Sequence, residues 1–161
     1  MSLVVSDTSP IRALHYLDLL DILGRLFDRV IVPPAVLHEL TQPRVRFNPV
    51  DFSQYAFVEV LAPHNLAQVQ QLRDVLDAGE SEALVLALEI GAEALLIDES
   101  TGRSIAVDKG MPVIGTLGIL SRAKGRAYVA TVGPLLDRLR VELDFYVSDK
   151  LREEFLRSVG E

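Results

Sequence analysis

The sequence contains no cysteine and no tryptophan, and aromatic residues make up only 6% of its 161 residues. Without cysteine, the chain has no disulfide framework, no cysteine-ligated zinc site and no thiol nucleophile. Long hydrophobic runs are also absent, because no stretch approaches the roughly 18 consecutive apolar residues that cross a bilayer. The first residues lack a basic segment followed by an apolar run. We therefore expect no signal peptide, no membrane association and a cytoplasmic protein.

Basic residues are the minority among the charged ones, with 16 Lys and Arg against 23 Asp and Glu and a net charge of −7. This balance argues against binding of nucleic acid through bulk charge, but it leaves room for a local basic patch or a bound metal ion. Apolar residues make up 49% of the chain, enough for a sizeable core, which excludes global disorder. The length predicts a single domain over residues 1–161.

Several familiar loop motifs are missing as well. The chain has no G-x-x-x-x-G-K-[ST], no G-x-G-x-x-G and no G-x-S-x-G segment. Their absence argues against a P-loop nucleotidase, a dinucleotide-dependent enzyme and a common serine hydrolase. The three histidines show no metal-ligand spacing.

Short apolar runs alternate with longer segments of helical periodicity. The runs predict strands at residues 3–5, 29–32, 57–61, 94–97 and 112–114. The alternation within residues 57–61 predicts that this strand lies at an edge of the sheet. The helical segments lie at residues 11–17, 35–40, 66–76, 80–90, 101–109, 116–124, 134–141 and 148–159. This alternation predicts an α/β fold, a three-layer sandwich in which helices flank a mostly parallel central sheet.

Two of the predicted strands end in an aspartate, Asp7 and Asp98. Ligands bind beyond the carboxyl ends of the strands in such sheets, so two neighbouring parallel strands would bring both carboxylates to one edge. Each aspartate is also a good helix N-cap, and taken singly that structural role is equally well supported. Taken as a pair, the two aspartates favour a shared site.

Two glutamates extend this set. Glu80 opens a helix, where the helix dipole alone would favour it, and Glu82 competes with it for one role. The tight turn at Gly79 favours Glu80. Glu39 has apolar neighbours, and an exposed position is as well supported for it as a half-buried one. Four carboxylates at one edge would repel one another, and a cation with oxygen ligands would relieve that repulsion, which favours Mg²⁺ or Mn²⁺.

Four segments together resemble the PIN-domain family: Asp7-Thr8-Ser9, Pro34-Ala35-Val36-Leu37-His38-Glu39-Leu40, Gly79-Glu80-Ser81-Glu82-Ala83 and Leu96-Ile97-Asp98. The later stretch from Val113 to Gly125 is similar to a PIN-like branch of bacterial and archaeal proteins related to toxin–antitoxin ribonucleases. The resemblance implies a PIN-like fold and a Mg²⁺- or Mn²⁺-dependent endoribonuclease that hydrolyses RNA phosphodiester bonds. It also implies the toxin of a toxin–antitoxin pair, silenced by an antitoxin protein that plugs the acidic pocket.

By this resemblance the catalytic residues are Asp7, Glu39, Glu80 and Asp98, and the metal ligands are Asp7, Glu80 and Asp98. We expect further residues to orient the carboxylates or the RNA phosphate, namely Thr8, Ser9, Arg103 and Thr116, although Thr116 is as well explained as a helix N-cap. Many family members carry another acid where this chain has Gly115-Thr116.

The apolar helices near the C-terminus predict either closure of the core or a homodimer interface. The alternative to an enzyme is a non-catalytic PIN-like binding or regulatory module with an acidic metal-binding pocket.

Overall fold

The computed structural model describes residues 2–161. Its internal contacts divide the chain into two compact units, Met1–Thr116 and Leu117–Glu161. The single domain expected from the sequence stays a prediction. Within the described residues, no helix is long and apolar enough to cross a membrane.

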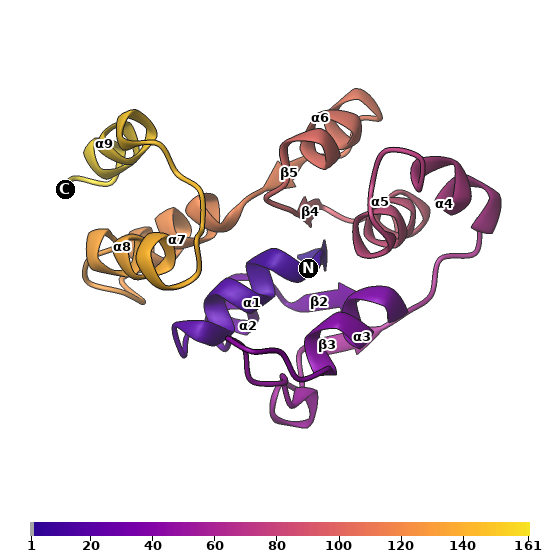
Figure 1. Ribbon diagram of the computed structural model, residues 1–161, viewed down its shortest axis with the longest axis horizontal. Coiled ribbons are helices and arrows are strands. Elements are labelled where there is room, and N and C mark those ends of the chain that lie inside the picture. Colours follow the sequence, from indigo (N-terminus) through magenta and orange to yellow (C-terminus); the bar gives the residue numbers. More distant parts are fainter. Residues whose placement is uncertain (1) are drawn as a thin grey trace. The chain divides into compact units, whose positions relative to one another are not determined.

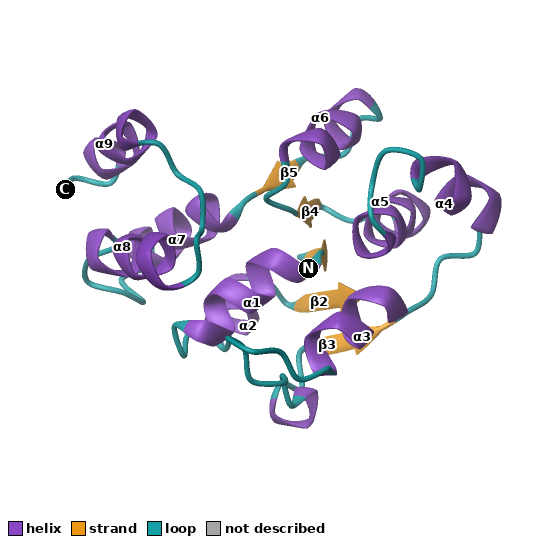
Figure 2. Ribbon diagram, viewed as in Figure 1, coloured by secondary structure: helices purple, strands orange, loops and turns teal. Residues whose placement is uncertain are grey.

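The first unit is built on a five-stranded sheet whose strands all run parallel (Figures 1 and 2). The strands are β1 (Leu3–Ser6), β2 (Arg29–Val32), β3 (Val58–Val60), β4 (Ala94–Leu96) and β5 (Val113–Ile114), in the order β3-β2-β1-β4-β5. Val4 in β1 pairs with Val30 on one side and with Ala94 on the other. The order reverses between β1 and β4, which makes this boundary the topological switch point of the sheet.

Helices connect the strands in the expected alternation. They are α1 (Thr8–Tyr16), α2 (Ile22–Leu26), α3 (Pro34–Thr41), α4 (Leu66–Leu72), α5 (Ala78–Ile90) and α6 (Ser100–Asp108), with a short 3₁₀ turn η1 (Phe52–Gln54). One apolar core joins the sheet to α4, α5 and α6 through residues such as Val5, Ile31, Leu84, Leu95 and Ala106. The α/β class, the parallel sheet flanked by helices and the edge position of the third strand are therefore confirmed.

The clearest difference from the sequence prediction concerns the helix expected over residues 66–76. Helix α4 ends at Leu72, and the chain then turns, with the amide of Leu76 still bonded to the carbonyl of Leu72 at 2.8 Å. Leu72 and Leu76 are both buried, so the turn keeps their apolar spacing while it brings Asp77 into position to cap α5. The short helix α2 was not predicted from the sequence.

The second unit consists of α8 (Gly133–Glu142), α9 (Asp149–Ser158) and most of α7 (Thr116–Gly125). The side chain of Glu161 accepts hydrogen bonds from the amides of Val132 and Gly133, at 2.8 and 3.0 Å. It also forms an ion pair with Lys124 at 2.7 Å. Because the first amides of a helix have no partner within it, this carboxylate stabilises the start of α8.

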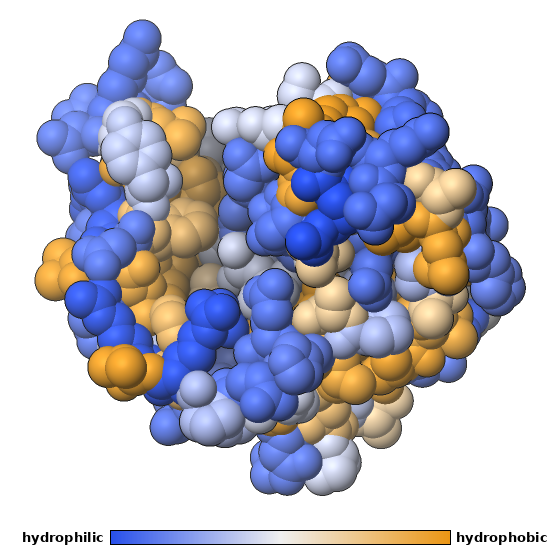
Figure 3. Space-filling view, turned by 45° about the vertical axis from the view of Figure 1, so that its right-hand side comes forward, coloured by the Kyte–Doolittle hydropathy of each residue, from blue (hydrophilic) through white to orange (hydrophobic). Residues whose placement is uncertain are grey.

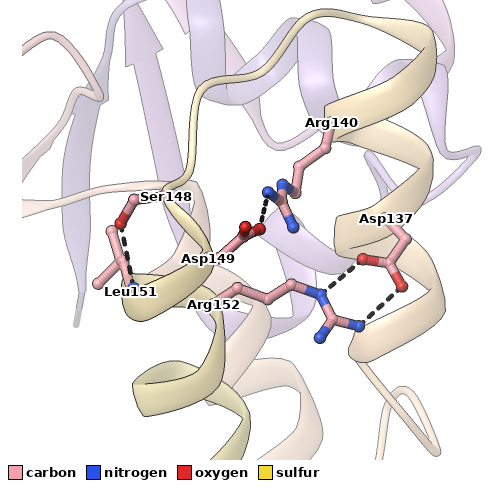
Figure 4. Close-up of polar contacts among 6 residues, drawn as sticks. All are labelled: Asp137, Arg140, Ser148, Asp149, Leu151 and Arg152. Carbon is pink, nitrogen blue, oxygen red and sulfur yellow. Dashed lines mark hydrogen bonds and ion pairs between the residues drawn. The ribbon is translucent and has the colours of Figure 1, made fainter.

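Charged pairs join α8 to α9 (Figure 4). Arg152 binds both carboxylate oxygens of Asp137, at 2.7 and 2.9 Å, and Arg140 contacts Asp149 at 2.7 Å. Ser148 caps α9 by accepting a backbone N–H from its first turn. The fork of Arg152 matches the carboxylate geometry, so this pair orients the two helices more specifically than a single contact would.

Hydrophilic side chains cover much of the face drawn in Figure 3, with apolar side chains gathered in patches between them. The exposed large apolar residues of the first unit are Val45, Val60, Leu61, Leu66, Val75 and Val107. Val45 is the most exposed of them, with its side chain fully in solvent. Scattered exposed apolar residues are ordinary on a protein surface, but a fully exposed one marks a projecting segment.

Candidate active site at the carboxyl edge of the sheet

The two strand-end aspartates lie at the switch point of the sheet. Asp7 follows β1 directly, and its backbone N–H donates to the carbonyl of Leu96 in the neighbouring β4 at 2.9 Å. Asp98 lies two residues beyond the end of β4. The structure therefore brings both aspartates to the carboxyl edge of two adjacent parallel strands, where open α/β sheets bind their ligands.

The start of α5 is packed closely against two acidic side chains. A Cβ atom placed on Gly79 would lie 3.2 Å from Asp7 Oδ1 and 3.4 Å from Glu39 Oε1. Asp7 comes from the end of β1 and Glu39 from α3, so three elements meet at this point. The tight turn expected at Gly79 is wrong, because Gly79 lies in the first turn of α5, where its missing side chain leaves room for these carboxylates.

Asp7, Glu39 and Glu80 make up what we call the acidic group, in which burial and like charges act together. Burial raises the pKa of Asp7 to about 8; a hydrogen bond from the amide of Thr8 opposes the shift, and the charges of Glu80, Asp77 and Glu39 add to it. Burial also raises the pKa of Glu80 to about 7, with a contribution from the Asp77 charge. Carboxylates in such surroundings favour a bound proton or a nearby cation.

The structure distinguishes Glu80 from Glu82. Glu80 forms a capping box with Asp77: its amide donates to Asp77 Oδ1 at 2.8 Å, and its Oε2 accepts the Asp77 amide at 3.4 Å. Glu82 Oε1 instead accepts the amide of Ala35 in the first turn of α3 at 3.1 Å. Glu82 thus ties α5 to α3, whereas Glu80 is the glutamate whose charge acts on Asp7.

Asp98 has surroundings of the opposite kind. The amide of Thr116 donates to Asp98 Oδ1 and the Thr116 hydroxyl donates to Oδ2, both at 2.7 Å. Burial raises the pKa of Asp98, while the Thr116 hydrogen bonds and the positive charge of Arg103 lower it. Arg103 Nη1 donates to the carbonyl of Ile97 at 2.9 Å. A Cβ on Gly115 would lie 2.8 Å from that Nη1 and 3.0 Å from Asp98 Oδ1.

A helix-capping role does not account for either aspartate. Asp7 occupies the N-cap position of α1, but its side chain makes no capping hydrogen bond. The cap of α6 is Glu99, whose Oε2 accepts the amide of Gly102 at 2.8 Å. The N-cap role that the sequence left open for Asp98 is therefore wrong, because Asp98 is turned toward Thr116.

The two remaining residues that we expect to have an orienting role, Thr8 and Ser9, open α1. Thr8 is buried, and its hydroxyl has no hydrogen-bond partner within the described part of the chain. Ser9 is exposed to solvent. A buried hydroxyl without a partner is uncommon and usually indicates a bound water, an ion or a ligand group next to it. Of the four residues expected to have an orienting role, Thr8 and Ser9 follow Asp7 in the chain, whereas Thr116 contacts Asp98 and the charge of Arg103 acts on it.

Sequence reasoning missed Arg12. This half-buried arginine of α1 donates from Nη2 to the backbone carbonyl of Glu39 at 3.2 Å. The charges of Glu39 and Asp7 both act on its guanidinium. A signal for it existed, because Arg12 follows Thr8 by four residues and so shares its helix face.

The donor set suits a hard divalent cation. All acidic side chains at this edge offer carboxylate oxygens, and the partnerless Thr8 hydroxyl adds another oxygen beside Asp7. Among residues 2–161, no three acidic or histidine side chains lie close enough together to enclose a metal ion. Mg²⁺ is commonly bound by one or two carboxylates and keeps several waters, so the arrangement fits that mode rather than an all-protein cage.

Comparison with known proteins identifies the family of the chain. The chain has no significant match among curated proteins. The model of the DUF3368 family, described as a PIN domain, matches residues 3–161. That match covers nearly the whole chain, and PIN domains are in general nucleases, so the fold is of a nuclease type. The chain belongs to the PIN-domain family.

Proposed function

We propose that this chain is a Mg²⁺- or Mn²⁺-dependent endoribonuclease. The observation that carries the proposal is the placement of Asp7 and Glu39 against Gly79, with the charge of Glu80 acting on Asp7, at the switch point of a nuclease-type fold whose adjacent strand end carries Asp98. Because the acidic group repels phosphate by itself, its chemistry needs a cation, and a phosphodiester substrate would then bind where the metal-free group would reject it.

In this proposal Asp7, Glu80 and Asp98 would hold the metal ion, directly or through water. A bound Mg²⁺ or Mn²⁺ would neutralise phosphate charge and supply a water of lowered pKa at neutral pH. Ionised carboxylates are needed for binding, so the raised pKa values of Asp7 and Glu80 mean that metal ions and protons compete for this group.

Other side chains position the reacting groups. Thr116 holds both oxygens of Asp98 through its amide and its hydroxyl, which fixes the orientation of that carboxylate. Arg103 uses one guanidinium nitrogen on the Ile97 carbonyl and retains further N–H donors for a phosphate oxygen. Glu39 borders the acidic group from α3, and the exposed Ser9 lies where substrate can reach it.

The test is cleavage of labelled structured and unstructured RNA in Mg²⁺, in Mn²⁺ and in EDTA. We expect internal cuts with 5′-phosphate and 3′-hydroxyl ends, only when metal is present. Asp7→Asn and Asp98→Asn should abolish cleavage while circular dichroism shows an intact fold. Full activity in both variants would overturn the assignment. Metal binding by calorimetry without any cleavage would instead favour the non-catalytic binding module.

Glu80 and Glu82 provide a matched control. Each substitution to glutamine removes one negative charge from the start of α5, and glutamine can still accept the amide hydrogen bond that each residue makes. We expect Glu80→Gln to lose cleavage and Glu82→Gln to retain it. Equal loss in both would mean that the total charge of the helix start matters rather than the position of Glu80.

We extend the proposal to a toxin role, with the acidic group as the feature that an antitoxin protein would neutralise with a cationic side chain. Expression of the chain should arrest growth, expression of Asp7→Asn should not, and co-expression of the product of an adjacent gene should restore growth. Homodimer formation is tested by light scattering of the purified chain. Growth arrest by Asp7→Asn as strong as by the wild type would contradict a nuclease toxin.

A further inference from the structure

We propose that the basic loop, defined as Arg44–Phe47, forms with Arg12 a docking surface for the phosphate backbone of an RNA strand that enters the acidic group. The inference rests on the proposed function in taking RNA as the occupant. It adds to that function a binding surface outside the acidic group, built from residues that the sequence motifs do not contain.

The basic loop is a tight turn closed by its own backbone. The amide of Arg44 donates to the carbonyl of Phe47 at 3.4 Å, and the amide of Phe47 donates back to the carbonyl of Arg44 at 3.2 Å. Between them, Val45 and Arg46 form the tip, and Arg44, Val45 and Arg46 are all exposed. The turn therefore presents two arginines and one apolar side chain to solvent.

Arg12 links the basic loop to the acidic group. Its guanidinium carbon lies 4.6 Å from the centroid of the Phe47 ring, within the range of a cation–π contact. The same guanidinium donates to the backbone carbonyl of Glu39, one of the residues beside Gly79. One side chain thus contacts both the turn and the backbone of Glu39.

Charges of both signs act on the Arg12 guanidinium. Burial lowers the pKa of Arg12 and the positive charge of Arg44 lowers it further, whereas the negative charges of Glu39 and Asp7 raise it. Arg12 contacts both sides, the basic loop through the Phe47 ring and the acidic group through the backbone carbonyl of Glu39. An anion that lies between neighbouring arginines reduces the repulsion between their positive charges. The acids beside Arg12 repel the same anion unless a cation is bound to them.

A single-stranded phosphate backbone fits this surface best. The chain as a whole carries a charge of −7, so any affinity for RNA has to come from a local basic surface. Arginine forks bind phosphate oxygens in pairs, and their planes also stack with unpaired bases. An open depression of about 400 Å³ is lined by the residues of the basic loop, including the exposed Val45, which offers an apolar contact for a sugar or a base.

The test is RNA binding without cleavage. A labelled, unstructured oligouridylate is titrated with the full chain carrying Asp7→Asn, and fluorescence anisotropy is followed between about 50 and about 200 mM salt. We expect Arg44→Gln/Arg46→Gln in this background to weaken binding about tenfold at low salt and to reduce the slope of log affinity against log salt by about 1.4, because each phosphate contact on a single strand contributes about 0.7.

The matched control is Arg122→Gln/Arg126→Gln, which removes the same charge from two other exposed arginines. We expect it to leave affinity and salt slope unchanged. Equal weakening by both double variants would reduce the effect to bulk charge and overturn the proposal, and so would unchanged binding of the Arg44→Gln/Arg46→Gln variant. Tighter binding of polyglutamate than of RNA through the same arginines would overturn RNA as the occupant.

This experiment separates the docking surface from the nuclease proposal. A wild-type chain that cleaves no RNA but binds it through Arg44 and Arg46 would retain the docking surface and reject the nuclease. A chain that cleaves RNA while the double variant binds as tightly as its parent would do the reverse.

Discussion

Asp7 and Asp98 occupy equivalent places at the ends of two adjacent parallel strands, yet their surroundings are opposite. Asp7 meets other carboxylates, and its pKa rises to about 8. Asp98 meets hydrogen-bond donors from Thr116, which act against the effect of burial on its pKa. A glycine lies against each of them, Gly79 at Asp7 and Gly115 at Asp98.

The difference shows that equivalent places in the topology can have different neighbours, although burial raises the pKa of both aspartates. Asp98 finds stabilising partners for its ionised form within the fold itself. Asp7 has the Thr8 amide in its favour, but burial and three neighbouring carboxylates outweigh it. We therefore expect a bound cation to affect the protonation of Asp7 more than that of Asp98, which has hydrogen-bond donors of its own.

The largest effect is expected for the two aspartate-to-asparagine variants in metal-free protein. Asp7 has a folded pKa near 8, above its ordinary 3.8, so the folded state retains a proton that the unfolded state releases. The stability contributed by protonated Asp7 is complete below pH 3.8 and is lost as the pH rises toward 8. The free energy of unfolding should fall by about 1.4 kcal/mol per pH unit across that window from this residue alone.

Asp7→Asn should therefore flatten the pH dependence and stabilise the metal-free chain at neutral pH. Asp98→Asn should destabilise it, because an amide cannot accept both Thr116 hydrogen bonds as a carboxylate does. Denaturant unfolding in EDTA at several pH values measures both effects. Equal changes of one sign in the two variants would remove the contrast between the strand ends.

A second prediction concerns Gly79→Ala. Alanine at a helix position should stabilise α5 by up to about 1 kcal/mol, since glycine is a poor helix former. The new Cβ would lie 3.2 Å from Asp7 Oδ1 and 3.4 Å from Glu39 Oε1, so the carboxylates must shift by a few tenths of an ångström. We expect unchanged or higher stability together with roughly tenfold weaker Mn²⁺ binding by calorimetry, the size seen when groups around a metal site are disturbed. Unweakened metal binding would place the ion away from Gly79.

A third prediction tests the donors around Asp98. Thr116→Val removes the hydroxyl but retains the backbone amide, so Asp98 Oδ2 loses its partner while Oδ1 retains one. We expect a loss of about 1 kcal/mol in unfolding free energy and a further rise in the pKa of Asp98. Thermal unfolding measures the first, and the pH dependence of stability measures the second. Thr116→Ser retains the hydroxyl and should behave like the wild type.

The sequence was sufficient to predict those parts of the candidate site that follow from local pattern. Strand ends carrying Asp7 and Asp98, and a helix start carrying Glu80, are visible as short motifs, and parallel sheet topology places the strand ends at one edge. Apolar spacing predicted the order of strands and helices for the same reason, since periodicity is a property of neighbouring residues.

The parts that the sequence did not predict depend on contacts between distant residues. The Glu82 carboxylate meets the amide of Ala35 across 47 positions, which no local pattern records. Arg12 reaches Glu39 only because α1 and α3 lie side by side. The hydroxyl of Thr116 reaches Asp98 because β5 pairs with β4 in one register. Local motifs therefore identified the acids, while their partners required the fold.

The smallest effect is expected for Gly115→Ala, the counterpart of the Gly79 variant at the other strand end. Its Cβ would lie 2.8 Å from Arg103 Nη1 and 3.0 Å from Asp98 Oδ1. The guanidinium is the end of a flexible side chain and can move aside, so the cost is the hydrogen bond to the Ile97 carbonyl, about 1 kcal/mol or less. We expect a slightly lower unfolding free energy and Mn²⁺ affinity close to that of the wild type, because the Thr116 donors still hold Asp98. If Gly115→Ala weakened metal binding as much as Gly79→Ala, Asp7 and Asp98 would be equal ligands. The different surroundings of the two aspartates would then not decide which of them depends on the cation.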